Sequence, residues 1–216
     1  GDVYKRQAFH HYFGEGDRCD LDTTYRFNNR IGEIANRFIQ QNPNQLAKPL
    51  NSLSAGDKKA VTLLAEDQLD ALLDKLSGYA RPEERILVLA RYHHLKPASL
   101  EKAATRWPKL QLDFMTIHAS KGQQADYVIV VGLQEGSDGF PAPARESVME
   151  QALLPVVEDF PDAEERRLLY VAMTRARHRV WLLFNKEQPS RFVEILKDID
   201  CLLYTSPSPR DRSLSR

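Results

Sequence analysis

The sequence lacks the marks of several protein classes. It has two cysteines, Cys19 and Cys201, which lie far apart and form no Cys-x-x-Cys pair. We therefore expect neither a disulfide scaffold nor a metal site, and a reducing cytoplasm is the expected compartment. No apolar run approaches the roughly eighteen residues of a membrane-spanning helix, so we expect no membrane segment. Ten glycines and twelve prolines are ordinary numbers for this length, which excludes a collagen-like or low-complexity chain.

Two signals of a self-sufficient nucleotide-hydrolysing domain are also missing. The sequence contains no Gly-Lys dipeptide, and therefore no phosphate-binding loop of the G-x-x-x-x-G-K-[ST] type. No apolar strand ends in Asp-Glu, the acidic pair that commonly orients magnesium beside a nucleotide. The usual phosphate cradle and the usual magnesium carboxylate are therefore both missing from the sequence.

Both ends of the chain resemble a DNA adapter rather than native protein. One codon choice for Cys201-Leu-Leu-Tyr-Thr-Ser206 reads as Asp2-Val-Tyr-Lys-Arg6 on the opposite strand, shifted by one base. We therefore expect residues 1–7 and 201–216 to be non-native, and residues 8–200 to be one domain cut from a longer protein. The balanced 30 basic and 30 acidic residues then become slightly acidic, because the ends are rich in arginine. A nucleic-acid contact would need a local patch.

Hydrophobic patterning predicts a single α/β domain with a parallel sheet. Continuous apolar runs are typical of strands that are buried on both faces, and helical patterns separate some of these runs. The expected strands are residues 86–90, 112–117, 127–132 and 180–184, and the expected intervening helices are residues 98–105 and 162–176.

The part of the chain before residue 80 predicts two further helices. The first is capped by Asn28 or Asn29, is stopped by Asn42-Pro43, and has one apolar face made of Ile31, Ile34, Ala35, Phe38 and Ile39. We expect a second helix over residues 57–76, with Gly78 as its C-cap. Residues 21–27 predict a short strand or turn, and residues 136–155 a long loop with a short helix.

Three segments could carry chemistry, and the first is Thr24-Tyr25-Arg26, directly before a predicted helix. A helix N-terminus attracts anions, so an aromatic ring and a guanidinium there could stack on a base and hold a phosphate. The alternative is that Tyr25 packs at the edge of the core and Arg26 is an ordinary surface charge.

The second segment runs from Phe114 to Gln124, where a predicted strand enters a small polar turn. Gly122 would let the backbone approach a ligand or adopt a positive φ, and Ser120 and Lys121 could meet phosphate oxygens. Ligands commonly sit beyond the carboxyl ends of parallel strands. The alternative is a strand turn with incidental polar residues.

The third segment is the predicted helix from Glu164, with basic residues continuing to Arg179. Its acidic start and basic end suit the helix dipole. Arg175 follows Val171 by four positions and Leu168 by seven, which places it on their apolar face. A buried guanidinium needs an anionic partner, either a carboxylate for structure or a nucleotide phosphate for function.

Taken in order, the three segments resemble motifs IV, V and VI of the UvrD/Rep-type superfamily 1 DNA helicases. The matching stretches are Leu21-Asp-Thr-Thr-Tyr-Arg-Phe-Asn-Asn-Arg30, Met115-Thr-Ile-His-Ala-Ser-Lys-Gly122 and Glu164-Glu-Arg-Arg-Leu-Leu-Tyr-Val-Ala-Met-Thr-Arg-Ala176. The ordered trio is specific, and the resemblance covers nearly all of residues 8–200. Residues 8–14 and 134–141 also resemble one bacterial branch of the family.

The resemblance implies a RecA-like parallel sheet flanked by helices, forming the second motor domain of an ATP-dependent DNA helicase of 3′-to-5′ polarity. It implies that Tyr25 stacks on adenine and that Arg26 and Arg175 reach the γ-phosphate of ATP, Arg175 as an arginine finger. It also implies that the turn formed by Thr116, His118, Ser120 and Lys121 faces single-stranded DNA, such as the tail of a 3′-tailed duplex.

Two departures from the family pattern bear on these roles. The family has Gly-Leu-Glu-Phe after the lysine of motif V, with its glutamate on the ribose, whereas this chain has Gly122-Gln123-Gln124-Ala125. Gln124 can still exchange a hydrogen bond but carries no charge. The short stretch between Ala90 and motif V also leaves no room for the large accessory domain that better-known members insert there.

The implied partners are DNA and an absent N-terminal motor domain that carries the phosphate loop and the magnesium ligands; no membrane partner is expected. We therefore expect the isolated chain to hydrolyse no ATP. Two other interpretations remain open: the motor part of a helicase–nuclease assembly, and a non-catalytic binding or scaffold domain with the same fold.

Overall fold

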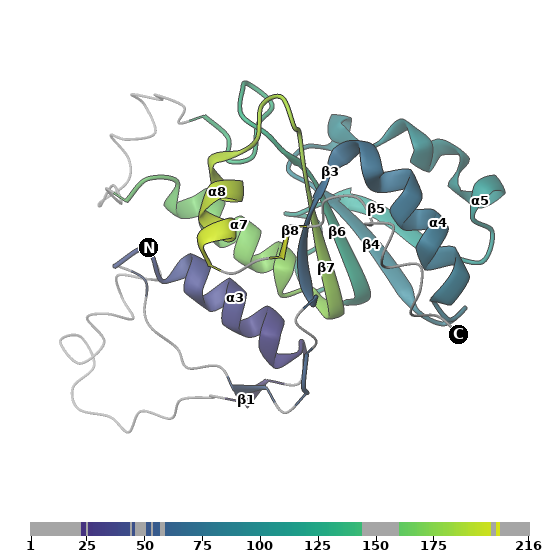
Figure 1. Cartoon of the computed structure of the whole chain (residues 1–216), viewed down its shortest axis with the longest axis horizontal. Coiled ribbons are helices and arrows are strands. Elements are labelled where there is room, and N and C mark those ends of the chain that lie inside the picture. The colour runs from purple at the N-terminus through teal and green to yellow at the C-terminus, as the bar shows by residue number, and fades with distance from the viewer. Residues whose placement is uncertain are drawn as a thin grey trace, which may run out of the picture.

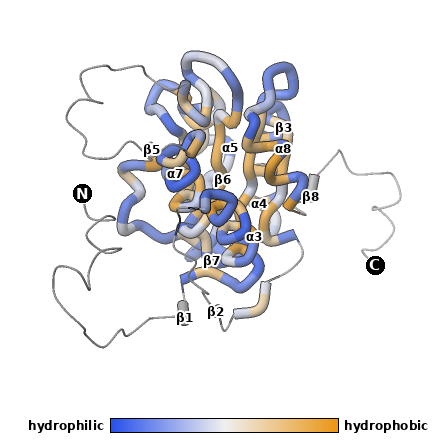
Figure 2. Tube along the Cα trace, turned by 90° about the vertical axis from the view of Figure 1, so that its left-hand side faces the viewer, coloured by the Kyte–Doolittle hydropathy of each residue, from blue (hydrophilic) through white to orange (hydrophobic). Residues whose placement is uncertain are grey.

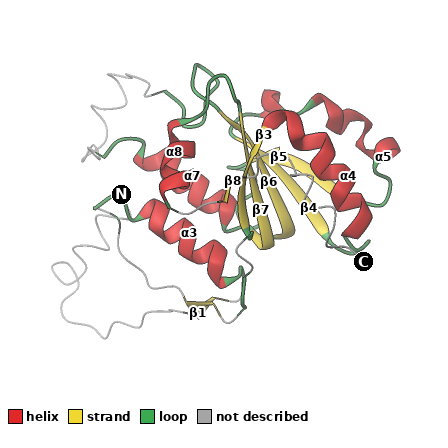
Figure 3. Cartoon of the chain, in the orientation of Figure 1, coloured by secondary structure: helices red, strands yellow, loops and turns green. Residues whose placement is uncertain are grey.

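A parallel sheet between two layers of helices forms the body of the molecule (Figures 1 and 3). The computed structural model describes residues 23–24, 26–43, 45, 51–52, 54–56, 59–143, 160–199 and 202–203 of the 216-residue chain. The expected class, an α/β domain with a parallel sheet flanked by helices, is confirmed. No helix in these ranges is long and apolar enough to cross a membrane.

The sheet has six strands in the order β5-β4-β6-β7-β3-β8, and every neighbouring pair runs parallel. The strands are β3 (Val61–Ala65), β4 (Arg85–Ala90), β5 (Gln111–Thr116), β6 (Ala125–Leu133), β7 (Ala176–Phe184) and β8 (Leu202–Leu203). A separate parallel pair joins β1 (Thr23–Thr24) to β2 (Asn51–Ser52). The central strands are almost wholly buried, as their continuous apolar runs predict.

Helices cover the sheet on both faces. One face carries α3 (Asn29–Ile39), α7 (Ala163–Met173) and α8 (Arg191–Asp198), and the other carries α4 (Leu69–Tyr79), preceded by the 3-10 turn η1 (Glu66–Gln68), and α5 (Ala103–Arg106), preceded by η2 (His93–Leu95) and η3 (Ala98–Lys102). Two apolar cores result, one on each side of the sheet. In Figure 2 the hydrophobic colour gathers along the strands and on parts of the covering helices.

The structure confirms the predicted apolar stripe of α3. Its five members, Ile31, Ile34, Ala35, Phe38 and Ile39, are all buried. They follow the i, i+3, i+4 spacing that places side chains on one side of a helix. The cap is Asn28, whose side chain accepts a hydrogen bond from the backbone of Ile31.

The predicted helix over residues 57–76 is wrong in its first half. Residues 61–65 form β3, an interior strand that pairs with β7, and the helix α4 begins only at Leu69. Leucine and alanine fit either state, and the buried position beside β7 decides for a strand. Gly78 lies inside α4, and the C-cap is Ala80.

The predicted helix over residues 162–176 ends earlier than expected. Thr174 caps α7, and β7 begins at Ala176, so the basic residues after Arg175 extend along a strand and do not complement a helix dipole. Of the long loop predicted over residues 136–155, residues 144–155 lie outside the described residues, as do residues 1–22.

Candidate nucleotide and DNA site

Asn28 brings the first and third candidate segments together. Its Oδ1 accepts from the backbone N–H of Ile31 at 3.0 Å and so caps α3. Its Nδ2 donates to the carbonyl oxygens of Arg177 at 3.2 Å and His178 at 2.8 Å, at the start of β7. Asn28 is 4% exposed, so these bonds are shielded from water. One buried amide therefore holds the N-terminus of α3 against the strand that follows Arg175.

Arg175 is half-buried and is held by backbone carbonyls. Its Nε donates to the oxygen of Val171 at 3.1 Å and its Nη1 to the oxygen of Gln123 at 3.3 Å. Within the described ranges, no carboxylate lies within ion-pair distance of Arg175. Burial lowers the pKa of this guanidinium, and the positive charge of Arg26 lowers it further. The carboxylate that could have satisfied Arg175 structurally is therefore missing from the described residues.

Arg26 lies close enough to Arg175 for the two charges to repel, although 149 positions separate them in the sequence. Its side chain is exposed. Two guanidiniums held near each other favour a site that binds a polyanion, because an anion between them relieves the repulsion. Tyr25, the expected adenine contact, lies outside the described residues.

The segment between β5 and β6 crosses one face of the sheet from the carboxyl end of β5 to the amino end of β6. It starts at Ile117, whose N–H donates to the oxygen of Ala90 at the carboxyl end of β4. It ends at Ala125, whose N–H donates to the oxygen of Arg175 at 3.1 Å. The segment thus extends from the carboxyl end of β5 to the amino end of β6, and the residues that follow motif V, Gln123 to Ala125, lie beside Arg175.

Within this segment the predicted residues fall into two groups. Gly122 has a φ of +84°, so of the two roles considered for it, the left-handed backbone is the one observed. The side chain of Gln124 is half-buried and makes no hydrogen bond to the described part of the chain. Gln124 lies between Gln123, whose carbonyl oxygen accepts from Arg175, and Ala125, whose N–H donates to the oxygen of Arg175, and so lies beside Arg175 at the amino ends of β6 and β7.

The other predicted residues of motif V lie toward the carboxyl end of β5. His118 and Lys121 are exposed. The hydroxyl of Thr116 accepts from the N–H of Ala119 at 3.2 Å, and the buried hydroxyl of Ser120 donates to the oxygen of Ile117 at 2.6 Å. Thr116 and Ser120 therefore use their side chains to shape the turn, and His118 and Lys121 present theirs to solvent.

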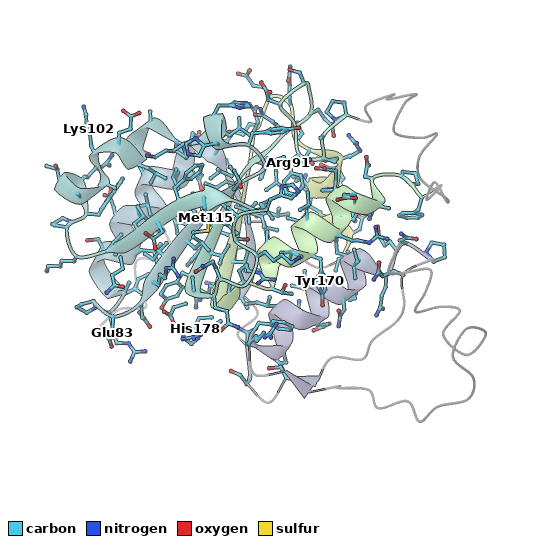
Figure 4. The ribbon with its side chains drawn as sticks, turned by 180° about the vertical axis from the view of Figure 1, so that it is seen from behind. Glu83, Arg91, Lys102, Met115, Tyr170 and His178 are labelled. Carbon is cyan, nitrogen blue, oxygen red and sulfur yellow. The ribbon has the colours of Figure 1, made fainter. Side chains whose placement is uncertain are left out.

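In Figure 4, Arg91 marks the carboxyl ends of the strands, because it follows β4, and His178 marks their amino ends, because it lies near the start of β7. Of the residues expected to meet the nucleotide, Arg26, Gln124 and Arg175 are described, and they lie on the His178 side. His118 follows the carboxyl end of β5, on the Arg91 side. The described nucleotide contacts and DNA contacts thus lie at opposite ends of the strands, and residues 117–124 connect them.

Sequence reasoning missed a buried ion pair at the start of α7. Arg91 contacts both carboxylate oxygens of Glu165, with Nε–Oε2 at 3.0 Å and Nη2–Oε1 at 2.9 Å. The side chains are 19% and 11% exposed. Glu165 also accepts from the N–H of Ala142 at 3.1 Å. The acidic start of this helix thus fastens the end of β4 and the loop after β6 to α7, and no local pattern identifies that partner.

Comparison with known proteins identifies the family of the chain. The family model of the UvrD-like helicase C-terminal domain matches residues 66–187. The chain belongs to this family of helicase domains.

Among individual relatives, the chain is 83% identical over 200 residues to DNA helicase IV of Escherichia coli K12, covering 93% of this chain and 29% of that protein. It is 34% identical over 102 residues to the ATP-dependent DNA helicase Rep of the same organism, covering 43% of this chain and 13% of Rep. A solved C-terminal domain of a possible DNA helicase from Lactobacillus aligns with 83% of this chain and 98% of its own, at 15% identity and a TM-score of 0.46. The chain thus spans less than a third of the curated relatives it matches.

Proposed function

We propose that this chain is the second motor domain of an ATP-dependent DNA helicase or translocase that moves 3′ to 5′ along single-stranded DNA in the cytoplasm. The observation that carries the proposal is the position of Arg175. Its guanidinium is half-buried and lies beside the positive Arg26. Among the described residues it donates to two backbone carbonyl oxygens and has no carboxylate partner. A nucleotide phosphate supplies the missing negative charge.

In this proposal Arg26 and Arg175 approach the γ-phosphate, and Arg175 stabilises the charge that develops on it during hydrolysis. Tyr25 stacks on the adenine, as the family resemblance implies. Gln124, with a side-chain amide that no described residue engages, bonds the ribose, and Gly122 lets the backbone turn beside it.

DNA contacts come from the turn at the other end of the crossing segment. His118 and Lys121 meet the bases and phosphates of the single strand, while Thr116 and Ser120 set the shape of the turn. A change in nucleotide state at Gln123 and Gln124 then reaches the DNA through the same eight-residue connection, residues 117–124. In this proposal, residues 117–124 couple ATP hydrolysis to the contact with DNA.

The bound Mg²⁺ of ATP would neutralise charge on the phosphates, as in other phosphoryl-transfer sites. The residues present fit half of that site. The Arg175 guanidinium, with Arg26 beside it, could meet phosphate oxygens, and the described ranges contain no group of three His, Cys, Asp or Glu able to hold a metal. In this proposal the magnesium ligands and the phosphate loop come from the first motor domain, as the family resemblance implies.

ATP hydrolysis with and without that first domain tests the proposal. The purified chain is expected to show no turnover with single-stranded DNA, and a longer protein that joins this chain to a domain with a phosphate loop is expected to show DNA-stimulated turnover. Steady hydrolysis by the chain alone, abolished by Arg175→Ala, would contradict the division of the site between two domains. Absence of turnover in the longer protein would favour the scaffold alternative.

A further inference from the structure

We propose that Arg85 and Gln123 are positioning residues that hold the arginine finger in place, an inference that deepens the proposed function and rests on it. Arg85 lies at the start of β4, and Gln123 lies in the crossing segment. Neither residue belongs to the expected nucleotide contacts. Together they connect the edge strand β5 to the guanidinium of Arg175.

The first step of the connection is an anchored arginine. The Nε of Arg85 donates to Oδ2 of Asp113 on β5 at 2.8 Å, and its backbone N–H donates to Oδ2 of Asp126 at 2.9 Å. Arg85 therefore has a fixed backbone and a side chain that is already oriented by a charge-assisted bond. Its Nη1 donates a hydrogen bond to Oε1 of Gln123 at 3.0 Å.

The second step passes through the backbone of Gln123. Its N–H donates to the oxygen of Ser120 at 2.9 Å, and its carbonyl oxygen accepts from Nη1 of Arg175 at 3.3 Å. The bond from Arg85 fixes the side chain of the same residue. Since Gly122 directly before it has a left-handed backbone, the orientation of this peptide depends on such restraints.

The departure at position 123 from the family's Gly-Leu-Glu-Phe pattern now has a structural reading. A leucine at this position could restrain the segment only by apolar packing. In this chain Gln123 is exposed, and the restraint is a hydrogen bond to Arg85. Because the hydrogen bond between Arg85 and Gln123 is exposed, it adds little to folding stability. Its role in this proposal is to orient Gln123.

The test is DNA-stimulated ATP hydrolysis by the longer protein that contains both motor domains, with kcat and KM for ATP measured separately. Gln123→Ala and Arg85→Met are each expected to lower kcat by about tenfold, as a displaced catalytic group does. KM for ATP is expected to stay within about twofold, because the affected interaction is made mainly in the transition state. Gln123→Glu keeps an oxygen facing Arg85 and should retain most of the wild-type kcat.

The double variant Gln123→Ala with Arg85→Met decides whether the two residues act as one unit. It should be no slower than either single variant, because breaking one connection twice has no further effect. Arg106→Met is the matched control, since Arg106 pairs with Asp70 and Asp74 on the opposite face of the sheet. Should Arg85→Met lower the melting temperature, Gln123→Ala is decisive, because it changes one exposed side chain.

Arg175→Ala in the same assay distinguishes a failure of the proposed function from a failure of the positioning role of Arg85 and Gln123. If Arg175→Ala keeps full turnover, the proposed function itself fails. If it abolishes turnover while Gln123→Ala and Arg85→Met retain the wild-type kcat, or if their effects multiply in the double variant, the positioning role is overturned and the arginine finger stands.

Discussion

Asn28 and His178 are joined by a hydrogen bond of 2.8 Å from the side-chain amide to the backbone carbonyl, although 150 positions separate them. The same amide group caps α3 through its oxygen. A single buried side chain therefore couples the N-terminus of α3 to the start of β7. This coupling places Arg26 beside Arg175, so the integrity of the candidate site and the stability of the fold depend on the same residue.

Replacing Asn28 should cost both stability and site geometry. We expect Asn28→Ala to lower the free energy of unfolding by about 2–3 kcal/mol, the sum of a lost N-cap and two unpaired carbonyls. Asn28→Ser keeps the cap oxygen and should recover about 1 kcal/mol of that loss. Urea unfolding of the chain measures both values, and equal stability of wild type and Asn28→Ala would show that the bonds contribute nothing.

The ion pair of Arg91 and Glu165 should be far more sensitive than surface pairs. Glu165→Gln leaves a largely buried guanidinium without its carboxylate and is expected to destabilise the chain by about 3 kcal/mol. The control is Glu194→Gln, which breaks the exposed pair with Lys197 and should change stability by less than about 0.5 kcal/mol. Losses of similar size in both variants would contradict the view that burial governs the effect.

Two glycines should respond in opposite ways to alanine. Gly122 has a φ of +84°, where an alanine is strained, so Gly122→Ala should lower stability by about 1 kcal/mol. Gly78 lies in α4, where an added Cβ atom would meet open space, and Gly78→Ala should raise stability by about 0.5–1 kcal/mol. Thermal unfolding of the two variants gives the signs, and a destabilised Gly78→Ala would contradict the assignment of that glycine to a helix.

Tyr127 should make the fold sensitive to high pH. Burial, then the charge of Glu84, raises the pKa of this phenol from 10.0 to about 12. The folded state therefore holds this proton more tightly than the unfolded chain does. The resulting stability is fully present below about pH 10 and is lost as the pH rises toward 12. Tyr127→Phe should weaken that dependence in urea unfolding across this range; an unchanged slope would exclude Tyr127 as its source.

Much of the architecture could be predicted because burial leaves a local trace. The apolar runs in β4, β6 and the second half of β7 and the stripe of α3 follow from the period of each element, whereas β5 is an edge strand in which exposed Gln111 and Asp113 alternate with partly buried residues. The strand β3 could not be predicted in this way, since Val61-Thr-Leu-Leu-Ala65 fits a helix or a strand until its pairing with β7 is known.

The sequence predicts candidate site residues, but it does not predict the contacts that connect them. The half-buried position of Arg175 follows from its spacing to Val171, even though the helix ends at Met173. The bonds of Asn28 to β7 and of Arg85 to Gln123 join side chains that are distant in sequence, and such contacts depend on the packed tertiary structure. The roles of the individual residues toward ATP and DNA stay predictions.

The most direct test of the account is the effect of Arg175→Ala on DNA-stimulated ATP hydrolysis by the longer protein, with Arg106→Ala as the exposed-arginine control. Loss of an arginine finger should lower kcat by about a thousandfold or more, with folding and DNA binding retained. The control should hydrolyse ATP like the wild type. Unchanged kcat in Arg175→Ala would contradict the central claim that this guanidinium completes a nucleotide site shared between two motor domains.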